Sequence, residues 1–394
     1  MKKIVLFRGD IETQGYFSEQ LATAFTAMGH AVYLFDYEKE GNSALGLPYF
    51  IEKGNTVAIS FNFHGITNEQ LLKDQNGLYI WEAMNIPFYN IVVDHPYYYH
   101  TFLQDIPSTY CHISIDAHQD AYMKRFYPEI KRGPILYLGG TSLYPAGDYP
   151  RIADRPLDIV FTGNYNNPLD MEQYIQKNGP EYADFYHGMI DELLAHPDLV
   201  IEDVIEKHIR REIPEVTDTE LKDTMKNLIF IDLYVRYHAR GLAVRTLADA
   251  GIPVHVYGGN WDLLQEQCKH PENIIWEGEL DSLECLQVIA KGKISLNVLP
   301  WFKAGPHDRI FNSMLNGAVS LTDSNPVIDS LVTDGKDACI YSLSNIDKLP
   351  LIADHLLSHP RLMQEIADAG FQTAQEHTWE ARAKVLHKVI EGEE

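Results

Sequence analysis

The sequence predicts an α/β protein made of two doubly wound domains, each with a parallel sheet covered by helices on both faces. Short continuous apolar segments rich in Val, Ile and aromatic residues recur along the chain, separated by segments of helix length. Continuous apolar strands that alternate with helices are typical of a parallel sheet buried on both faces. The pattern pauses at a turn-rich stretch, residues 139–150, and then starts again. We therefore expect one domain on each side of that stretch.

The first domain is predicted to span residues 1–150. Its expected strands are residues 3–8, 31–36, 56–61, 88–93, 111–115 and 135–138. A helix is expected at residues 16–29, where apolar residues fall on one face and Gly29 ends the periodic pattern.

The second domain is predicted to span residues 151–376. Its expected strands are residues 157–161, 254–257, 274–276, 294–298, 319–322 and 338–341. An insertion at about residues 166–250 separates the first two of these strands and is far longer than an ordinary crossover. The insertion is predicted to be helical, with helices at residues 181–195, 199–211 and 218–249, the last preceded by a capping box of Thr217 and Glu220. Helices of this kind usually shape a cleft or an oligomer contact.

Composition and charge limit the classes of function. The chain has 394 residues, of which 45% are hydrophobic and 22% charged, enough for two ordinary cores. Its net charge of -24 disfavours a nucleic-acid or anionic-membrane surface. No apolar segment is long enough to span a bilayer, and the first apolar run ends at Arg8, too soon for a signal peptide. Four widely spaced cysteines indicate neither a zinc site nor a disulfide framework, so we expect a cytoplasmic protein.

Residues 303–323 combine a glycine-proline turn, a short amphipathic helix and a buried strand. A helix that begins at this turn directs unpaired backbone N–H groups and the positive end of its dipole toward a ligand. His307 and Arg309 add side-chain donors, and Gly305 permits close approach of the backbone. This combination suits a phosphate or a diphosphate. The same order of residues is also compatible with an ordinary scaffold helix.

Other candidate ligand groups follow the expected strands of the second domain. Gly163 and Asn164 follow the first strand, Tyr257, Gly258 and Asn260 end or follow the second, and Trp276 and Gly278 end or follow the third. Glycine lets the backbone approach a ligand, asparagine both donates and accepts, and an aromatic ring suits a nucleobase. Arg236 and Arg240 share a helix face and suit a phosphate or carboxylate. Ordinary turns, a core tryptophan and pairing with acidic residues explain these features as well.

In the first domain, Asp94 and His95 follow the fourth expected strand, where a general base or a hydroxyl-binding carboxylate can reach a crevice. Three consecutive tyrosines, residues 97–99, can stack on a sugar or a peptide. A strand-end Asp and His held by backbone hydrogen bonds is the alternative interpretation. His64 follows the third expected strand. No nucleophile elbow, Walker loop, zinc-protease motif or dinucleotide fingerprint is present, which disfavours a hydrolase triad, an ATPase and a zinc enzyme.

With these motifs the chain resembles GT-B glycosyltransferases, which have two Rossmann-like domains facing a cleft, and within them the CgeB-like, group 1 type family. The motif HDRIFNSMLNG at residues 307–317, followed by LTD at residues 321–323, carries most of the resemblance. Further support comes from residues 231–236 and, in the first domain, from the Asp94-His-Pro sequence. The resemblance implies that the second domain holds a nucleotide sugar and that the acceptor lies against the first. It also implies that the final helix, residues 377–394, crosses back to the first domain.

The activity implied by the resemblance is transfer of a sugar from a nucleoside diphosphate, by default UDP, to an unidentified hydroxyl or protein side chain. No metal and no other cofactor is implied. The implied nucleotide-sugar-binding residues are Gly163, Asn164, Arg236, Arg240, Tyr257, Gly258, Asn260, Trp276, Gly278, Gly305, His307, Asp308, Arg309 and Asn312. Group 1 enzymes carry two glutamates around this helix, where Ala304 and Asn312 stand here, so retaining and inverting outcomes both stay open. For an inverting reaction, Asp94 or His95 is the expected base.

Two other functions fit the same two-domain plan. A sugar-nucleotide 2-epimerase needs acids and bases from both domains around one sugar and needs no acceptor. A non-catalytic cytoplasmic protein that binds nucleotide sugars needs no base at all. The large insertion and the tyrosines at residues 97–99 favour a transferase with an acceptor site.

Overall fold

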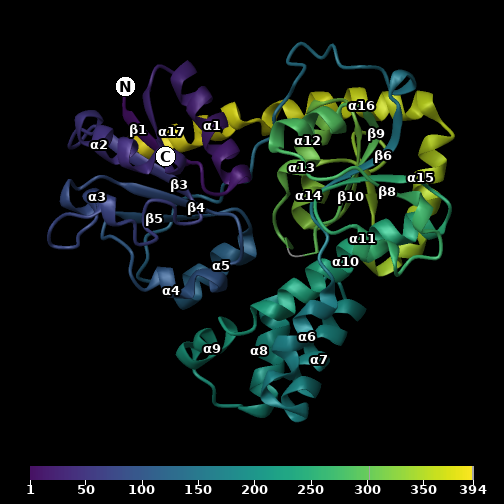
Figure 1. The fold of residues 1–394 in the computed structure, drawn as a ribbon, viewed down its shortest axis with the longest axis horizontal. Helices are drawn as coiled ribbons and strands as arrows, with labels where there is room; N and C mark the ends of the chain where they lie inside the picture. Colours follow the sequence, from purple (N-terminus) through teal and green to yellow (C-terminus); the bar gives the residue numbers. More distant parts are fainter. Residues whose placement is uncertain (301, 393–394) are drawn as a thin grey trace. The chain divides into compact units, whose positions relative to one another are not determined.

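The protein divides into two compact units, each with its own parallel sheet. The computed structural model describes residues 1–300 and 302–392. Met1–Gly139 and the C-terminal segment from His377 onward form the first unit, and Gly140–Glu376 forms the second (Figure 1). The predicted fold class is confirmed, because both sheets are entirely parallel and helices connect their strands.

The sheet of the first unit has five strands in the order β2-β1-β3-β4-β5. These strands are β1 (Lys3–Arg8), β2 (Ala31–Asp36), β3 (Thr56–Phe61), β4 (Phe88–Val92) and β5 (Tyr110–Ser114). They confirm the first five strands predicted for this domain. Every residue of β3, β4 and β5 is buried, as expected of strands covered on both faces.

The prediction of a sixth strand at residues 135–138 is wrong, because this segment is extended but is not part of the sheet. Pro134, just before it, has no N–H to donate and interrupts pairing beside β5. Beyond the proline, the Leu136 N–H donates to the Ser114 carbonyl at 2.9 Å. An apolar pattern alone did not reveal this interruption.

Helices cover both faces of the first sheet. They are α1 (Glu12–Ala27), α2 (Glu40–Phe50), α3 (Ile80–Ala83), α4 (His100–Leu103), α5 (Ala117–Phe126) and α17 (Trp379–Glu391). The helix α1 begins one turn earlier than predicted and buries Phe17, Leu21 and Phe25. The C-terminal helix α17 packs against α1, with the rings of Phe17 and Trp379 4.9 Å apart. The aromatic contact anchors the end of the chain on the first unit.

The sheet of the second unit has six strands in the order β11-β10-β9-β6-β7-β8. These strands are β6 (Leu157–Thr162), β7 (Val254–Tyr257), β8 (Ile274–Trp276), β9 (Gly292–Asn297), β10 (Val319–Asp323) and β11 (Cys339–Tyr341). All six predicted strands of this domain are confirmed. Their helices are α11 (Asp262–Gln265), α12 (Ser282–Ile289), α13 (Asp308–Leu315), α14 (Pro326–Leu331), α15 (Leu349–Leu357) and α16 (Pro360–Ala374). One contiguous apolar core, which includes Ile159, Val256 and Leu296, holds the layers together.

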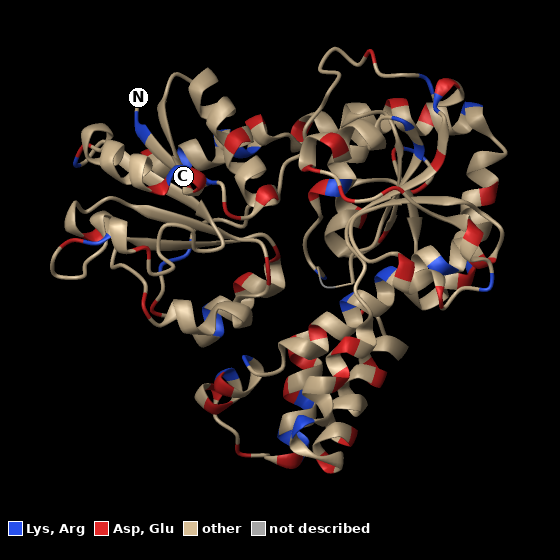
Figure 2. Ribbon diagram, in the orientation of Figure 1, with Lys and Arg blue, Asp and Glu red and all other residues tan. Residues whose placement is uncertain are grey.

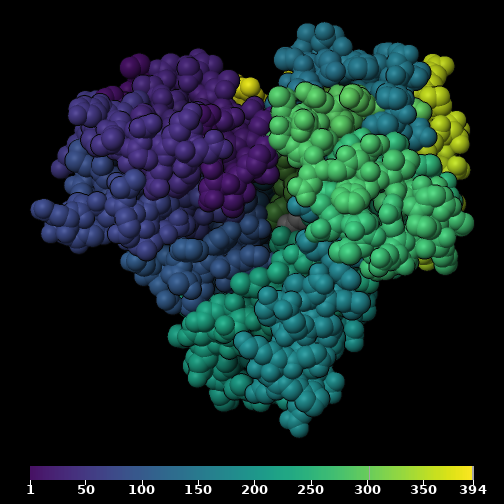
Figure 3. Space-filling model, in the orientation of Figure 1, coloured from purple at the N-terminus to yellow at the C-terminus, as the bar shows by residue number. Residues whose placement is uncertain are grey.

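The insertion between β6 and β7 is helical, as predicted. It contains α6 (Glu172–Ile175), α7 (Pro180–Ala195), α8 (Ile201–Glu212), α9 (Asp218–Met225) and α10 (Ile229–Asp249). In Figure 3, its residues, coloured teal, form a packed block. The predicted capping box is present, since Thr217 Oγ1 accepts the Glu220 N–H and the Glu220 carboxylate accepts the Thr217 N–H.

The single helix predicted at residues 218–249 is instead two helices, α9 and α10. The break follows Asn227, whose side-chain amide donates to the Asp223 backbone carbonyl at 2.9 Å. A side chain that takes the hydrogen bond of a helix carbonyl competes with continuation of the helix.

Each sheet reverses the direction of its winding once. In the first unit the reversal lies between β1 and β3, and in the second it lies between β6 and β9. The crevice outside the carboxyl ends of such neighbouring strands is where ligands bind in open α/β sheets. The loops at these two switch points are therefore the first places to look for function.

The segment that follows Gly140 is fixed to the second unit by two asparagines of the α13 region. Asn312 Oδ1 accepts the Thr141 N–H at 2.8 Å, and Asn316 Oδ1 accepts the Leu143 N–H at 2.9 Å. The Asn316 amide also donates to the Thr141 carbonyl at 2.8 Å. These bonds explain why the division between units falls at Gly140, earlier than the boundary at residue 150 expected from composition.

Asn316→Ala is expected to destabilise the second unit. Asn316 is fully buried, and its loss removes partners from the Leu143 N–H and the Thr141 carbonyl. Leaving buried backbone groups unsatisfied costs about 3 kcal/mol here, which lowers the melting temperature by roughly 6–12 °C. Differential scanning fluorimetry measures the change. Asn178→Ala, at an exposed position of the same unit, serves as the control. Equal melting temperatures for the two variants would contradict this role of Asn316.

Candidate functional site

Three basic side chains gather at the switch point of the second unit. Arg309 comes from α13, Arg240 from α10, and His307 immediately precedes α13. Both guanidinium groups lie against the ring of Phe161 in β6, at 5.5 Å for Arg309 and 5.9 Å for Arg240. Phe161 is fully buried, so its ring is a fixed platform for two cations. Residues from distant parts of the chain thus form one positively charged cluster.

Each of the two arginines at this platform donates a hydrogen bond to a neutral acceptor. Arg309 Nη1 donates to Asn297 Oδ1 at 2.9 Å, and Arg240 donates to the Asn164 backbone carbonyl. Arg236, predicted to act with Arg240, instead forms a largely buried ion pair with Asp232 at 2.9 Å. Hydrogen bonds to neutral acceptors hold a guanidinium in place without cancelling its charge. Arg240 and Arg309 are therefore the members of the cluster best suited to an anionic ligand.

Burial and repulsion between like charges lower pKa values in this cluster. Burial, followed by the charges of Arg309 and Arg236, lowers the pKa of Arg240 to about 9. Burial also lowers the pKa of Arg309, while Asp308 opposes that change. Both arginines still carry their charge near pH 7. Holding like charges together costs free energy that a bound anion recovers.

His307 is the N-cap of α13. Its Nδ1 lies 3.2 Å from the Arg309 backbone nitrogen and 2.6 Å from Asp308 Oδ1. As a bare nitrogen, Nδ1 accepts the backbone N–H, and as an N–H it donates to Asp308. Burial, followed by the charge of Arg309, lowers the pKa of His307, so the imidazole is neutral near pH 7. In the first of these tautomers Nε2 carries the proton and is a donor.

The loops after β6, β7 and β8 contact one another directly. The Trp276 Nε1–H donates to the Gly258 carbonyl at 2.7 Å, and the Gly258 N–H donates to the Gly278 carbonyl at 2.8 Å. A Cβ atom added to Gly258 would lie 2.5 Å from the Gly163 carbonyl oxygen. One added to Gly163 would lie 3.5 Å from a guanidinium nitrogen of Arg309. The predicted glycines therefore bring these loops together and link Trp276 to the cationic cluster.

Trp276 is not a core residue, because 43% of its surface is exposed while its indole N–H is fixed. A fixed, exposed aromatic face suits stacking with a flat ring. Asn164 Oδ1 accepts the Gly259 N–H at 2.9 Å, and Asn260 adopts a left-handed backbone with φ of 66°. The Tyr257 side chain instead packs in the apolar core. Its predicted contact with the nucleotide sugar stays a prediction.

Comparison with known proteins agrees with this geometry. Residues 240–388 match the model of a family described as glycosyl transferase-like, a range that contains α13 and Trp276. No curated protein sequence matches the chain. The chain has the fold of GT-B glycosyltransferases, and its residues 240–388 resemble the glycosyl transferase-like family. The family resemblance predicted from the motifs at residues 307–323 is confirmed.

Solved structures similar to this chain cover its whole length. A sucrose-phosphate synthase from Thermosynechococcus elongatus has a TM-score of 0.57 at 12% identity, covering 100% of this chain and 99% of its own. A glycosyltransferase from Rickettsia africae has a TM-score of 0.54 at 10% identity, covering 99% of this chain and 98% of its own. Alr3699/HepE from Anabaena, solved with UDP-glucose, has a TM-score of 0.52 at 12% identity and covers 100% of both chains. At this identity the similarity shows the fold alone.

Asn312 and Gly305 hold the helix α13 and its preceding loop in place. Asn312 uses both ends of its amide, since Oδ1 accepts the Thr141 N–H and Nδ2 donates to Asp308 Oδ2 at 2.9 Å. The Gly305 carbonyl accepts a 2.9 Å hydrogen bond from the buried Asn325 side chain. Contacts of Asn312 with a ribose and of Gly305 with a diphosphate stay predictions.

Asn297 and Phe161 are contacts of the cluster that the sequence did not single out. Both belong to strands and are fully buried, so their sequence pattern is that of core residues. Asn297 also donates to Thr322 Oγ1 at 2.9 Å, which fixes the oxygen that receives Arg309. A polar residue at the carboxyl end of a buried strand was the available signal.

Asp323, at the end of β10, is a buried carboxylate beside this cluster. Its Oδ2 accepts the Leu299 N–H at 2.9 Å, and only 4% of the residue is exposed. Burial raises the pKa of Asp323 to about 7. The residue lines a pocket of about 310 Å³ together with Lys303 and Tyr341.

The predicted base candidates lie in the first unit, where each is held by neighbours. Asp94 Oδ2 accepts hydrogen bonds of 3.1 Å from the Asn62 amide and from the Tyr99 hydroxyl. His95 is 6% exposed, and its Nδ1 accepts the Tyr97 N–H at 3.3 Å as the N-cap of a short 3-10 helix. Tyr97 is itself buried. The assignment of the base to Asp94 or His95 stays a prediction, and these contacts favour a positioning role.

Two searches of the described residues concern metals and membranes. Within residues 1–300 and 302–392, no three His, Cys, Asp or Glu side chains are grouped as metal ligands. In the same part of the chain, no helix has the length and apolar character needed to cross a membrane.

Asp323→Asn is expected to stabilise the protein more at pH 8 than at pH 5. The folded state holds a proton on Asp323 up to about pH 7, whereas the ordinary value of this pKa is 3.8. Stability is therefore lost as pH rises between these values, by about 2–4 kcal/mol. The asparagine keeps an acceptor for the Leu299 N–H without this loss. Melting temperatures at both pH values measure the effect.

The exposed Asp354→Asn variant controls for the change in net charge. If Asp323→Asn and Asp354→Asn differ from wild type by the same amount at both pH values, Asp323 does not titrate as described.

Proposed function

We propose that this chain is a glycosyltransferase that moves a sugar from a nucleoside diphosphate, with UDP as the first choice, to a hydroxyl or protein side chain of an acceptor. The observation that carries the proposal is the pair of guanidinium groups, Arg240 and Arg309, on the Phe161 ring at the switch point of the second unit. Planar guanidiniums match the oxygen geometry of a diphosphate. The Anabaena protein with the same fold was solved with UDP-glucose, which supports UDP.

In the proposed reaction the diphosphate leaves the anomeric carbon with the bonding electron pair. Its growing negative charge is met by Arg240, Arg309 and the N-terminal N–H groups of α13. Donors already in position need no reorganisation when the charge develops. These groups supply the charge that a divalent cation supplies elsewhere, so we propose transfer that does not depend on a metal. Turnover in the presence of EDTA tests that point.

Trp276 is proposed to stack on the nucleobase. Its exposed ring is connected to the cationic cluster through Gly258 and Gly163. A flat aromatic face at one end and two cations at the other match the chemistry of a nucleoside diphosphate. The arrangement does not depend on the identity of the sugar.

Arg309→Met and Arg240→Met are each expected to weaken UDP binding about 10–100-fold, because each removes a charge-assisted hydrogen bond to the diphosphate. Binding of uridine, which has no phosphate, is expected to stay the same. Isothermal titration calorimetry with the full chain measures both ligands. Arg361→Met, whose side chain is 95% exposed, is the matched control. Wild-type affinity of both variants for UDP would place the diphosphate elsewhere.

Trp276→Ala is expected to weaken UDP and uridine to the same extent, about 5–10-fold, because stacking contributes about 1 kcal/mol. Trp276→Phe retains an aromatic face and should recover most of the affinity. A loss of UDP affinity without a loss of uridine affinity would contradict stacking on the base.

A panel of nucleotide sugars, tested for thermal stabilisation and then for nucleotide release, separates the remaining alternatives. Saturating donor at 100 times its Kd stabilises a protein by about 2.7 kcal/mol. A transferase releases nucleoside diphosphate at a rate that increases with acceptor. An epimerase changes the sugar at a rate that does not depend on an acceptor. A binding protein releases no nucleoside diphosphate. If no nucleotide sugar raises the melting temperature, the proposal fails.

A further inference from the structure

A pocket of about 610 Å³ lies in the helical insertion of the second unit. Its walls come from α7 and α8, from the segment directly after α8 and from residues at and after the end of α9. None of the described residues that line it belongs to the candidate nucleotide-sugar site. Ligand pockets typically have volumes of about 300–1,000 Å³. The size of this pocket therefore suits a binding function of its own.

The floor of the pocket is largely apolar. Its buried lining residues are Tyr186, Ile209 and Leu228. The Tyr186 ring packs edge-on against Phe230, with the ring centroids 5.1 Å apart, and lies 5.9 Å from the ring of Phe185. These aromatic contacts hold the Tyr186 ring in place. A fixed apolar floor suits one apolar side chain of a partner.

The rim of the pocket combines exposed apolar side chains with carboxylates. Tyr182 is 54% exposed and Ile213 is 57% exposed, and the Tyr182 ring lies 6.2 Å from that of Tyr186 on the floor. The side chains of Glu181 and Asp184 are exposed on the same helix as Tyr182. Large apolar side chains that gather at one exposed place mark a surface that gains free energy when a partner covers it.

The carboxylates of Glu181 and Asp184 are not neutralised by neighbours. Within residues 1–300 and 302–392, neither forms an ion pair or a side-chain hydrogen bond. Arg211, a basic residue of the lining, donates from Nε to Glu212 Oε1 at 3.1 Å and so balances a third carboxylate of the rim. The rim therefore presents two negative charges to a partner.

The acidic character extends over the helices around the pocket. Residues 180–228, which contain α7, α8 and α9, hold 13 Asp and Glu residues against 5 Lys and Arg residues (Figure 2). A surface of one sign attracts partners of the opposite sign and repels those of its own. Phosphorylated ligands and nucleic acids are therefore disfavoured. A symmetric contact with a second copy is disfavoured as well, because it would bring the same acidic rim against itself.

We infer that this pocket binds a polypeptide segment in which Lys or Arg residues flank an apolar side chain. The apolar side chain occupies the floor. The flanking cations meet the carboxylates of Glu181 and Asp184, and their apolar stems lie on the Tyr182 ring, whose face also attracts a cation. A neutral glycan would form hydrogen bonds at the rim without using its charge, so charge complementarity favours the basic segment. The inference does not depend on the proposed sugar transfer.

The test measures binding of fluorescein-labelled peptides to the full chain by fluorescence anisotropy. The first peptide has one leucine flanked on both sides by lysines. In the second peptide the same lysines are acetylated, and in the third the leucine is replaced by glycine. Acetylation removes the charges and is expected to weaken binding about 5–10-fold. Glycine leaves the floor unfilled and is expected to weaken binding about tenfold.

Variants of the rim test the assignment of its residues. Tyr182→Ala is expected to weaken binding of the first peptide about 2–5-fold, whereas Tyr182→Phe should retain the affinity. Glu181→Gln combined with Asp184→Asn should bring the affinities of the lysine and acetyl-lysine peptides within about twofold of each other. All three side chains are exposed, so the variants should fold, and their melting temperatures verify this.

Two exposed positions outside the lining provide matched controls. Asp191→Asn removes a carboxylate from the same helix, and Tyr49→Ala removes a ring from a residue that is 91% exposed in the first unit. Both should bind the first peptide as wild type does. UDP affinity should be the same in all variants, so failure of the peptide site and failure of the proposed function are separate results.

Several outcomes would overturn the inference. Equal affinity for the leucine and glycine peptides, or equal weakening by Asp191→Asn and by the double variant of the rim, would reduce the contact to general attraction by an acidic surface. Absence of saturable binding of the first peptide would exclude the basic segment. Binding of maltohexaose in place of the peptide would assign the pocket to a neutral glycan. Dimers in analytical ultracentrifugation that Tyr182→Ala abolishes would assign it to a second copy of the chain.

Discussion

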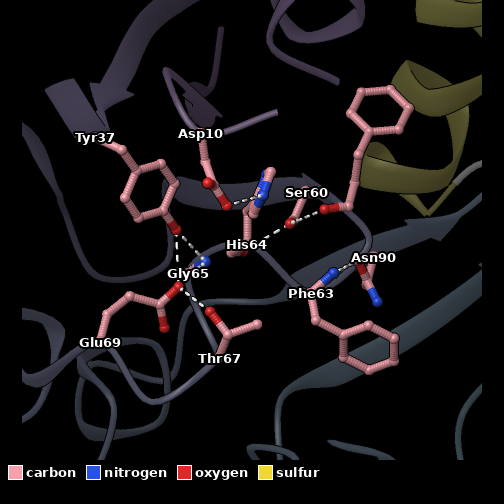
Figure 4. Close-up of polar contacts among 10 residues, drawn as sticks. Asp10, Tyr37, Ser60, Phe63, His64, Gly65, Thr67, Glu69 and Asn90 are labelled. Atoms are coloured by element: carbon pink, nitrogen blue, oxygen red, sulfur yellow. Dashed lines mark hydrogen bonds and ion pairs between the residues drawn. The ribbon is translucent and has the colours of Figure 1, made fainter. Parts of the chain in front are cut away.

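The reversal of strand order in each sheet is the constraint on which the side-chain clusters at both switch points depend. Parallel strands that wind in opposite directions from a central pair leave a crevice at their carboxyl ends that no crossover helix covers. In the second unit this crevice collects Arg240 and Arg309 on the Phe161 ring. In the first it collects Asp10 and His64 (Figure 4). The same topology thus gathers two arginines at the switch point of one unit and a carboxylate–imidazole pair at the switch point of the other.

The net charge of the whole chain does not describe the local charges at the two switch points. The net charge is -24, and acidic side chains are spread over the helices of both units (Figure 2). Surface charges are screened beyond about 8 Å at physiological salt, so the local groups determine what each crevice binds. The arginines against Phe161 donate hydrogen bonds to the neutral Asn297 side chain and the Asn164 carbonyl, and these acceptors do not cancel their positive charge. A chain that repels polyanions in general can therefore still hold one diphosphate.

The sequence allowed the sheets to be predicted well because buried parallel strands are continuous apolar runs, whereas local interruptions were missed. Pro134 acts through a missing N–H donor and Asn227 through one side-chain hydrogen bond, and a periodic pattern contains neither. In the candidate site, His307 and Arg309 were predicted because the residues that form the start of a helix are neighbours in the sequence. Phe161 and Asn297 lie in buried strands, so the sequence pattern around them is that of core residues. The left-handed backbone of Phe63 and the contact of His64 with Asp10 depend on tertiary structure alone.

The asparagine at position 312 has a structural explanation that the sequence could not provide. Asn312 accepts the Thr141 N–H and donates to Asp308, two tasks that require one acceptor and one donor on the same side chain. An ionised glutamate, as in the group 1 enzymes that the motif resembles, has acceptors only and would face the carboxylate of Asp308 one turn earlier. The acidic group of this helix therefore stands at its first residue, beside His307, where the positive end of the helix dipole stabilises it. Asp308 and Asn312 are best understood as one coupled pair that fixes both the helix and the segment following Gly140.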